Sequence, residues 1–231
     1  MYCIDHEAYE TLLQMCPSNF KKFHIEDNFL SKRECIMLSE YIKYHKLLSR
    51  SSLNPDNFGS TYSFQIYFNK YSKNDFLNSP YNLKPIYDIF ERIKQPGTNA
   101  YVFNPIVLDG LRVFEKNTNK IRYHYDDTLD LSDNMGKLYL PVCVTILYIQ
   151  VPEKFIGGTL KMHDFGYLEC HNLGIIEIRP EVGKKVVFRG DMHHGVSSLY
   201  CSKDTKRISL VFEQYNIPEN RLNEVNFRVE R

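Results

Sequence analysis

A histidine and an aspartate two residues apart are the side chains of this sequence best placed to do chemistry. They are His124 and Asp126, in the segment Tyr123–His124–Tyr125–Asp126. Alternate residues of a β-strand point to the same face, so both side chains can bind one ion if the segment is extended. A third ligand from another strand would complete a set of two imidazoles and one carboxylate. Such a set suits Fe(II) and leaves coordination positions open for other ligands.

Two adjacent histidines, His193 and His194, offer that third ligand. If their stretch is extended they point to opposite faces, so only one of them can reach an ion held by the first pair. A competing pair, His24 and Glu26, has the same spacing but lies just before an expected helix, and we predict a surface turn there. A His-x-Asp pair also arises by chance, so the first pair indicates a metal site only together with the segments that follow it.

An ordered series of segments follows His124. It comprises a buried strand, a Gly-Gly turn, a Pro-to-Gly turn that opens another strand, a His-Gly-Val segment and an Arg-x-Ser segment: Val142–Ile149, Gly157–Gly158, Pro180–Gly183 with Lys184–Phe188, His194–Val196 and Arg207–Ser209. In this order the segments resemble the Fe(II)- and 2-oxoglutarate-dependent dioxygenases, especially the prolyl-hydroxylase-like branch. The resemblance covers roughly residues 28–215.

The resemblance implies which side chains hold the metal. His124, Asp126 and His194 match the family's catalytic Fe(II) ligands. The residues after His194 match those that follow the distal ligand in the family, which leaves His193 with a solvent-facing or supporting role. The small Gly195 beside the ligand also lets the backbone bend where the strand enters the barrel.

The resemblance also implies a site for 2-oxoglutarate. Arg207 matches the residue that binds the far carboxylate, and a guanidinium can do so bidentately while staying charged when buried. A surface charge on the strand is the alternative for Arg207. Ser209, on the same strand face, would add a hydroxyl donor. Tyr148 matches a tyrosine that contacts the cosubstrate, unless a slip of one residue puts Ile149 there. The resemblance further implies O2 as cosubstrate and stimulation by ascorbate.

Three positions depart from patterns of the family. Glu213 lies six residues after Arg207, where nucleic-acid demethylases of the AlkB type carry a second Arg. Collagen-type prolyl hydroxylases have Lys in place of Arg207, so the match is closer to the Arg-bearing oxygen-sensing and ribosomal hydroxylases. Phe114 stands where a Tyr is common.

The expected activity is hydroxylation of a C–H bond with decarboxylation of 2-oxoglutarate to succinate. The expected substrate is a protein or peptide, or a small polar molecule, beneath the loops 50–82 and 127–138, whose Tyr, Asn and Asp residues suit such a ligand. Two alternatives stay open. The same chemistry can oxidise a nucleobase or nucleoside that stacks on aromatic side chains, and a metal-free jelly roll can serve as a binding module.

Helices are expected mainly in the first hundred residues. Ser31 and Glu34 form a capping box, and apolar residues at helical spacing then predict a helix over 31–48. A second helix should begin at Pro85 and end before Pro96, and a weaker one is expected over 5–15. The segment 50–82 should be a loop with one strand near Ser63–Phe68.

Strands dominate the rest of the chain. Short apolar or alternating runs separated by turn residues predict eight strands, at 108–115, 120–125, 142–149, 158–162, 174–179, 184–189, 195–200 and 206–214. We therefore expect a mainly β fold with N-terminal helices (α+β): a double-stranded β-helix, or jelly roll, supported by helices on one face. Residues 1–231 should form a single domain, with a helical support region over 1–100 and the jelly-roll catalytic core over 101–215.

The composition is that of a globular protein with no dominant charge. The 231 residues are 43% hydrophobic and 25% charged, and 29 Lys and Arg against 28 Asp and Glu give a net charge of +1. With so little net charge, the sequence gives no electrostatic indication that the protein binds nucleic acid or an anionic membrane. The six cysteines include no C-x-x-C pair, and neither a signal peptide nor a membrane-spanning run is visible. We therefore expect reduced thiols and a cytoplasmic location.

Overall fold

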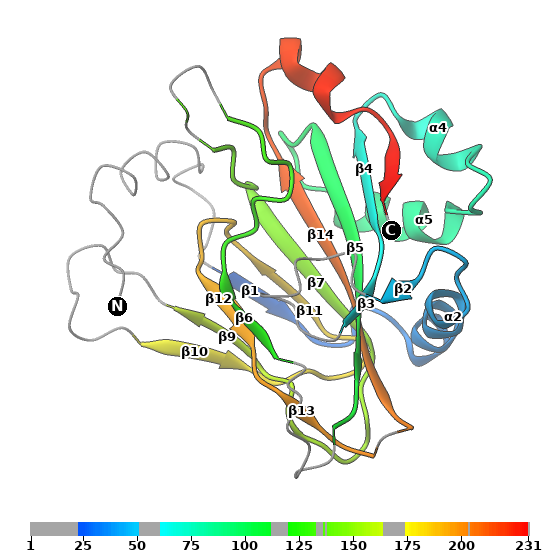
Figure 1. Cartoon of the computed structure of the whole chain (residues 1–231), viewed down its shortest axis with the longest axis vertical. Coiled ribbons are helices and arrows are strands. Elements are labelled where there is room, and N and C mark those ends of the chain that lie inside the picture. Colours follow the sequence, from blue (N-terminus) through cyan, green and yellow to red (C-terminus); the bar gives the residue numbers. More distant parts are fainter. Residues whose placement is uncertain are drawn as a thin grey trace.

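Two antiparallel sheets form the centre of the protein, and the helices lie against the outer side of the larger sheet, away from the smaller one (Figure 1). The computed structural model describes residues 23–50, 61–111, 120–132, 136, 138–163, 174–202 and 204–230. The weak helix expected over 5–15 lies outside these ranges.

The larger sheet contains nine strands of the described residues. Its hydrogen-bonded path runs β1-β11-β7-β14-β5-β3-β2, with β4 joined to β5 and β15 joined to β4. The bounds are β1 Phe23–Glu26, β2 Ser49–Arg50, β3 Thr61–Ser63, β4 Gln65–Asn69, β5 Ala100–Asp109, β7 Cys143–Gln150, β11 Lys185–Phe188, β14 Lys206–Tyr215 and β15 Arg228–Glu230. Strand β14 lies between β7 and β5 and is paired on both sides.

The smaller sheet faces the larger one across the interior. Its four strands follow the order β10-β9-β12-β6, and a separate pair joins β13 to β8. The bounds are β6 Ile121–His124, β8 Ile156–Gly157, β9 Leu160–His163, β10 Ile175–Ile178, β12 His194–Val196 and β13 Leu199–Tyr200. The result is a jelly roll with helices on one face, the fold class that the sequence predicts.

Successive side chains of the central strands point to opposite faces of the larger sheet, and each face packs in its own apolar core. On β7, Leu147 and Ile149 pack beneath the helices, whereas Ile146 and Tyr148 face the smaller sheet. A strand buried on both faces has no polar side, which explains why this segment reads as a continuous apolar run. The three helices on the outer core are α2 Lys32–Lys43, α4 Lys73–Leu77 and α5 Lys84–Ile93.

Helix α2 begins with the expected capping box. The Glu34 backbone N–H donates to Ser31 Oγ at 3.2 Å, and the Ser31 N–H donates to Glu34 Oε2 at 2.8 Å. Arg92 of α5 pairs with Glu34 at 2.6 Å, which links the two helices. The hydrogen bonds from Ser31 and Arg92 lower the pKa of Glu34 to about 2. The helix ends at Lys43, earlier than expected, and a turn follows in which His45 Nε2 meets the Tyr81 carbonyl oxygen at 3.0 Å.

Three sequence predictions about elements are wrong. The pair His24 and Glu26 lies not in a turn but in β1, an edge strand that pairs with β11. In the segment 50–82 the strand expected near Ser63–Phe68 is present as β4, but the described residues also form β3 and the helix α4 where loop was expected. Strand β5 begins at Ala100, eight residues before the predicted start at 108. Pro105 lies within this strand where the ladder to β3 and β4 is interrupted, at 104–106, and a residue without an N–H is tolerated there.

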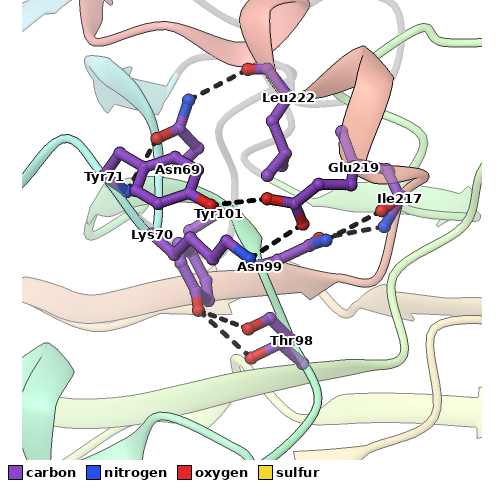
Figure 2. Close-up of polar contacts among 9 residues, drawn as sticks. All are labelled: Asn69, Lys70, Tyr71, Thr98, Asn99, Tyr101, Ile217, Glu219 and Leu222. Atoms are coloured by element: carbon purple, nitrogen blue, oxygen red, sulfur yellow. Dashed lines mark hydrogen bonds and ion pairs between the residues drawn. The ribbon is translucent and has the colours of Figure 1, made fainter.

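The C-terminal segment closes one end of the larger sheet. A 3₁₀ helix, η1 (Glu219–Val225), follows β14, and Figure 2 shows how it is attached. Glu219 accepts from Lys70 Nζ at 2.8 Å and from the Tyr71 hydroxyl at 2.5 Å. Asn69 Nδ2 donates to the Leu222 carbonyl oxygen at 2.9 Å. These contacts hold the end of β4 against η1.

Within the described residues, no helix combines the length and the apolar character needed to cross a membrane.

The capping box gives a prediction about stability. Ser31→Ala should lower the free energy of unfolding by about 1 kcal/mol at pH 7, because an N-cap hydroxyl is lost. Since the folded pKa of Glu34 is depressed to about 2, its contribution is present above the unfolded pKa and disappears as the pH falls through about 2. Urea unfolding at pH 7 and pH 3 should therefore show a smaller difference in the free energy of unfolding between wild type and Ser31→Ala at the lower pH. Ser31→Asn, which keeps a capping side chain, should stay close to wild type; equal destabilisation by both variants would contradict the assignment.

Candidate metal centre

Three side chains from the smaller sheet and the loop beside it meet in the interior. His124 ends β6, His194 begins β12, and the two residues lie opposite each other in the strand register. Asp126 follows β6 directly. One candidate ligand atom from each of the three lies within 4.8 Å of the others. Asp126 and His194 are buried, with 7% and 5% of their surface exposed.

Hydrogen bonds orient the two imidazoles toward the carboxylate. Nδ1 of His124 lies 2.8 Å from the Arg122 carbonyl oxygen, and Nδ1 of His194 lies 2.9 Å from that of Met192. A carbonyl oxygen only accepts, so each Nδ1 carries a proton, and each ring in its neutral form presents a lone pair at Nε2. The Nε2 atoms lie 3.4 Å (His124) and 3.5 Å (His194) from the two Asp126 oxygens.

The electrostatics favour an ionised carboxylate and a neutral distal imidazole. Burial raises the pKa of Asp126, but the charges and the hydrogen bond of His194 and His124 outweigh it, so the pKa is lowered overall. Burial lowers the pKa of His194. Burial also lowers the pKa of His124, but the adjacent Asp126 raises it by more. A lone pair on His194 beside an anionic carboxylate is the charge state that a divalent cation requires.

One buried atom supports a cation at this place. Asp126 Oδ2 is buried, and no hydrogen bond reaches it within the described ranges. A buried carboxylate oxygen without a donor is costly unless a cation compensates it. Two imidazoles and a carboxylate on one side of a cavity fit a divalent iron, with positions left open toward the cavity.

The local backbone differs from the simple picture of two ligands on one strand. Strand β6 ends at His124, so Asp126 is not on the strand but in the segment after it. Gly195 lies next to His194, and a Cβ there would come within 2.8 Å of the Ile121 carbonyl oxygen. Only glycine therefore allows β12 to approach β6 this closely.

His193 points away from the three clustered side chains. Its ring stacks on His163 with 5.4 Å between centroids and lies 5.3 Å from Tyr123 and 4.9 Å from Tyr125. Burial and the neighbouring His163 lower the pKa of His193 to about 4. The two adjacent histidines thus face opposite sides of the smaller sheet, as the sequence predicts for an extended stretch.

The clustered side chains open onto a cavity of about 290 Å³ between the sheets. Its walls combine apolar side chains with polar and charged ones from both sheets, and the residues are Gln65, Tyr67, Asn104, Ile106, Ile121, His124, Tyr125, Asp126, Asp127, Thr128, Ile146, Leu160, His194, Val196, Arg207, Ser209, Val211 and Glu213. The site residues predicted from the sequence line this cavity, except for Tyr148: they are His124, Asp126, His194, Arg207 and Ser209. The cavity lies at the small end of the range for ligand sites, roughly 300–1,000 Å³.

Arg207 is buried in the wall of this cavity, not exposed on a strand surface. It is 2% exposed, and its Nε and Nη1 atoms have no hydrogen-bond partner within the described part of the chain. Its Cζ lies 5.0 Å from the centre of the Tyr148 ring. Burial lowers the pKa of Arg207, but a guanidinium stays charged in proteins. A buried cation with unused donors requires an anion, and the cavity is where one can enter.

The register places Tyr148, and not Ile149, on the side of Arg207. Tyr148 is opposite Ser209 across the β7–β14 ladder, and a register shift follows at Ile208. Ile149 packs in the outer core beneath the helices. The Tyr148 hydroxyl is buried and has no hydrogen-bond partner among the described residues.

From the sequence, Glu213 is notable only as a departure from the AlkB-type pattern, and its place in the cavity wall was not predicted. Burial, together with the charge of Asp126, raises the pKa of Glu213 to about 8. The available signal was its place on β14: positions 207, 209, 211 and 213 alternate and share one face. Gln65, Tyr67 and Asn104 of the cavity wall were also missed, because the strands that carry them were expected to be loop or to begin later.

No protein-family model and no curated protein sequence matches the chain. Solved structures do resemble it. A prolyl-4-hydroxylase from Pseudomonas putida is 14% identical with a TM-score of 0.52, and the alignment covers 92% of this chain and 99% of that one. The carbocyclase SnoK of nogalamycin biosynthesis, described as non-heme and alpha-ketoglutarate dependent, is 13% identical with a TM-score of 0.55, covering 92% and 84%.

A third similar structure is a prolyl hydroxylase from Trichoplax adhaerens, in complex with a peptide fragment of the hypoxia inducible factor oxygen degradation domain. It is 13% identical with a TM-score of 0.54, and the alignment covers 94% of this chain and 91% of that one. At such identities the likeness concerns the fold. The chain thus has the jelly-roll fold found in prolyl hydroxylases and other 2OG-Fe(II) oxygenases.

Proposed function

We propose that this protein is an Fe(II)- and 2-oxoglutarate-dependent dioxygenase that hydroxylates a C–H bond. One observation carries the proposal: the His124, Asp126 and His194 cluster and the buried Arg207 face the same cavity. Asp126 and Arg207 have buried polar atoms without a hydrogen-bond partner among the described residues, and the two imidazoles turn Nε2 inward. The fold shared with 2OG-Fe(II) oxygenases supports it.

In this proposal His124 and His194 bind Fe(II) through Nε2, and Asp126 binds it through a carboxylate oxygen. The carbonyl contacts of Arg122 and Met192 hold the rings in the required tautomer. Bound Fe(II) supplies the oxidative chemistry that side chains lack, so that O2, 2-oxoglutarate and R–H yield R–OH, succinate and CO2. Ascorbate would then stimulate turnover by keeping the iron reduced.

Arg207 is the proposed anchor of 2-oxoglutarate. Its donors can form a bidentate pair with the carboxylate farther from the metal. Ser209, two residues along the same face, offers a hydroxyl to that carboxylate. Tyr148 lies beneath the guanidinium and is buried with its hydroxyl unused among the described residues, so it can complete the same site.

The proposed substrate is a protein or peptide, or a small polar molecule, in the cytoplasm. The Trichoplax adhaerens structure holds a peptide, which supports the first option. Oxidation of a nucleobase is the second candidate, and the net charge of +1 disfavours it for a duplex substrate, because no excess of basic residues is present to bind phosphates. A metal-free binding module would leave Asp126 and Arg207 buried without compensation.

The metal assignment predicts a sharp difference between two neighbouring aspartates. Asp126→Asn should lower Fe(II) affinity on the order of 100-fold or more, because the anionic ligand is lost. Asp127→Asn should retain iron, since Asp127 is exposed and does not join the cluster. Iron per protein after anaerobic reconstitution, with a chelator competition, measures this. Equal retention by both variants would remove Asp126 from the metal site.

The two adjacent histidines form a second matched pair. His194→Ala should abolish both iron retention and succinate formation in the absence of substrate. His193→Ala should keep iron, because the ring stacks on His163 on the other side of the smaller sheet. If His193→Ala lost iron while His194→Ala kept it, the strand register would have to shift by one residue.

Arg207→Lys tests the cosubstrate site and with it the proposed function. Lysine keeps the charge but loses the planar fork, so the KM for 2-oxoglutarate should rise roughly 10- to 100-fold, with iron content unchanged. Succinate formation at a series of 2-oxoglutarate concentrations gives the KM. Arg33→Lys, at an exposed position of α2, is the control. An unchanged KM in Arg207→Lys would place the anchor elsewhere, and no succinate from the wild-type Fe(II) protein would reject the function.

A further inference from the structure

A second buried charge-bearing residue lies at the other end of the cavity from Arg207. Glu213 is 2% exposed and lies on the same face of β14. Six residues of extended strand separate the two Cα atoms by about 20 Å, so the acid and the guanidinium are too far apart to form an ion pair. Val211 lies between them on this face.

The contacts of Glu213 are hydroxyl groups, not cations. Thr128 Oγ1 donates to Oε1 at 2.6 Å, and the Tyr215 hydroxyl donates to Oε2. No Lys or Arg forms an ion pair with Glu213 in the described residues. Arg228, on β15, pairs with Glu230 and lies over the Tyr67 ring, 3.6 Å from its centre.

Polar side chains of the larger sheet surround this end of the cavity. The register places Tyr67 opposite Val102, and Val102 opposite Glu213, so the tyrosine and the acid lie two strands apart on one face. Gln65 and Asn104 also line the cavity here. Their own hydrogen bonds fix them: the Tyr67 hydroxyl donates to Gln65 Oε1 at 3.1 Å, and the Ser63 hydroxyl donates to Asn104 Oδ1.

Once the proposed ligands bind, the charges of the other groups in the cavity cancel one another. The two positive charges of Fe(II) and the charge of Arg207 offset Asp126 and the two carboxylates of 2-oxoglutarate. Glu213 then remains as a buried group with no counterion, and a buried carboxylate is strongly stabilised by a paired cation that also donates hydrogen bonds. The end of the cavity not used by Arg207 is the part left for the substrate.

We propose that Glu213 is a specificity-determining residue that binds a cationic nitrogen of the substrate, an ammonium or a guanidinium. The proposal rests on the proposed function and adds the substrate class: a basic amino acid, either free or as a side chain in a peptide. The hydroxyls of Thr128 and Tyr215 hold the carboxylate oxygens in place, while Gln65 and Asn104 offer polar contacts to the rest of the ligand.

The competing explanation is structural. A neutral Glu213 carboxyl group would tie Thr128, in the segment after the metal ligands, to the larger sheet. Charged and neutral ligands of the same shape would then bind alike, because no anion would be available to tell them apart.

The test compares pairs of ligands that have nearly the same shape but differ in charge. Arginine and lysine are paired with citrulline and norleucine, each as the free amino acid and in the centre of a blocked tripeptide. Calorimetry on the protein loaded with Mn(II) and 2-oxoglutarate measures affinity without turnover, and succinate formation with Fe(II) measures stimulation. At least one basic ligand should bind ten times or more tightly than its neutral partner, and the free or the peptide form that responds identifies the source.

Glu213→Gln then asks which residue creates the preference. The amide has the same shape and keeps one acceptor for the hydroxyls, and the preference for the basic ligand should fall at least tenfold. Glu153→Gln, on an exposed part of the segment after β7, is the matched control and should keep the full preference. Circular dichroism checks that each variant is folded, and the wild-type comparison stands even if Glu213→Gln does not fold.

The outcomes separate this proposal from the one on which it rests. Equal binding of charged and neutral ligands, no binding of any of them, or an undiminished preference in Glu213→Gln overturns the role of Glu213. If the wild-type protein still binds iron and forms succinate from 2-oxoglutarate in those cases, the proposed function stands. If it does neither, both proposals fall together.

Discussion

Strand β14 is buried on both faces, and this constraint couples the core of the protein to its site. Ile208, Leu210 and Phe212 pack beneath the helices, whereas the residues between them face the cavity. Because β14 is paired with β7 and β5 at once, a slip of one residue would exchange the two sets. Arg207 would then enter the apolar core under the helices. The packing of the apolar residues therefore determines where the charged ones lie.

A second constraint acts on the smaller sheet, where β12 must approach β6 closely. The side chains of His124 and His194 face each other because their strands are in register, with 4.5 Å between ring centroids. Gly195 permits that approach, since a Cβ would clash with the Ile121 carbonyl oxygen. Phe188 of the larger sheet packs edge-on against the His194 ring. The two histidines are thus positioned by backbone proximity on one side and by apolar packing on the other.

Much of this arrangement follows from local sequence patterns, and what does not follow depends on contacts between distant segments. The capping box at Ser31, the apolar run of β7 and the face of β14 that carries Arg207 are local, and the sequence predicts them. Among the described strands, the edge strand at His24 pairs with β11 alone, and that pairing joins segments about 160 residues apart, which a local pattern does not reveal. Glu213 is a single acid in an apolar strand. That it is buried with no Lys or Arg beside it among the described residues can be seen only in the folded structure.

The cavity keeps apart an acidic and a basic side chain that would stabilise each other as an ion pair if they met. Arg207 and Glu213 share one face of one strand, yet the spacing of residues along β14 holds their Cα atoms about 20 Å apart. Each is buried, and within the described residues neither has an oppositely charged side chain as its partner. Replacing both with apolar residues of similar volume would remove two desolvation costs, so folding does not require them. Ligands that bring a carboxylate to one end and a cation to the other would stabilise the folded state in proportion to their affinity. In the roles proposed for Arg207 and Glu213, the two separated groups therefore serve the binding of ligands and not the stability of the empty fold.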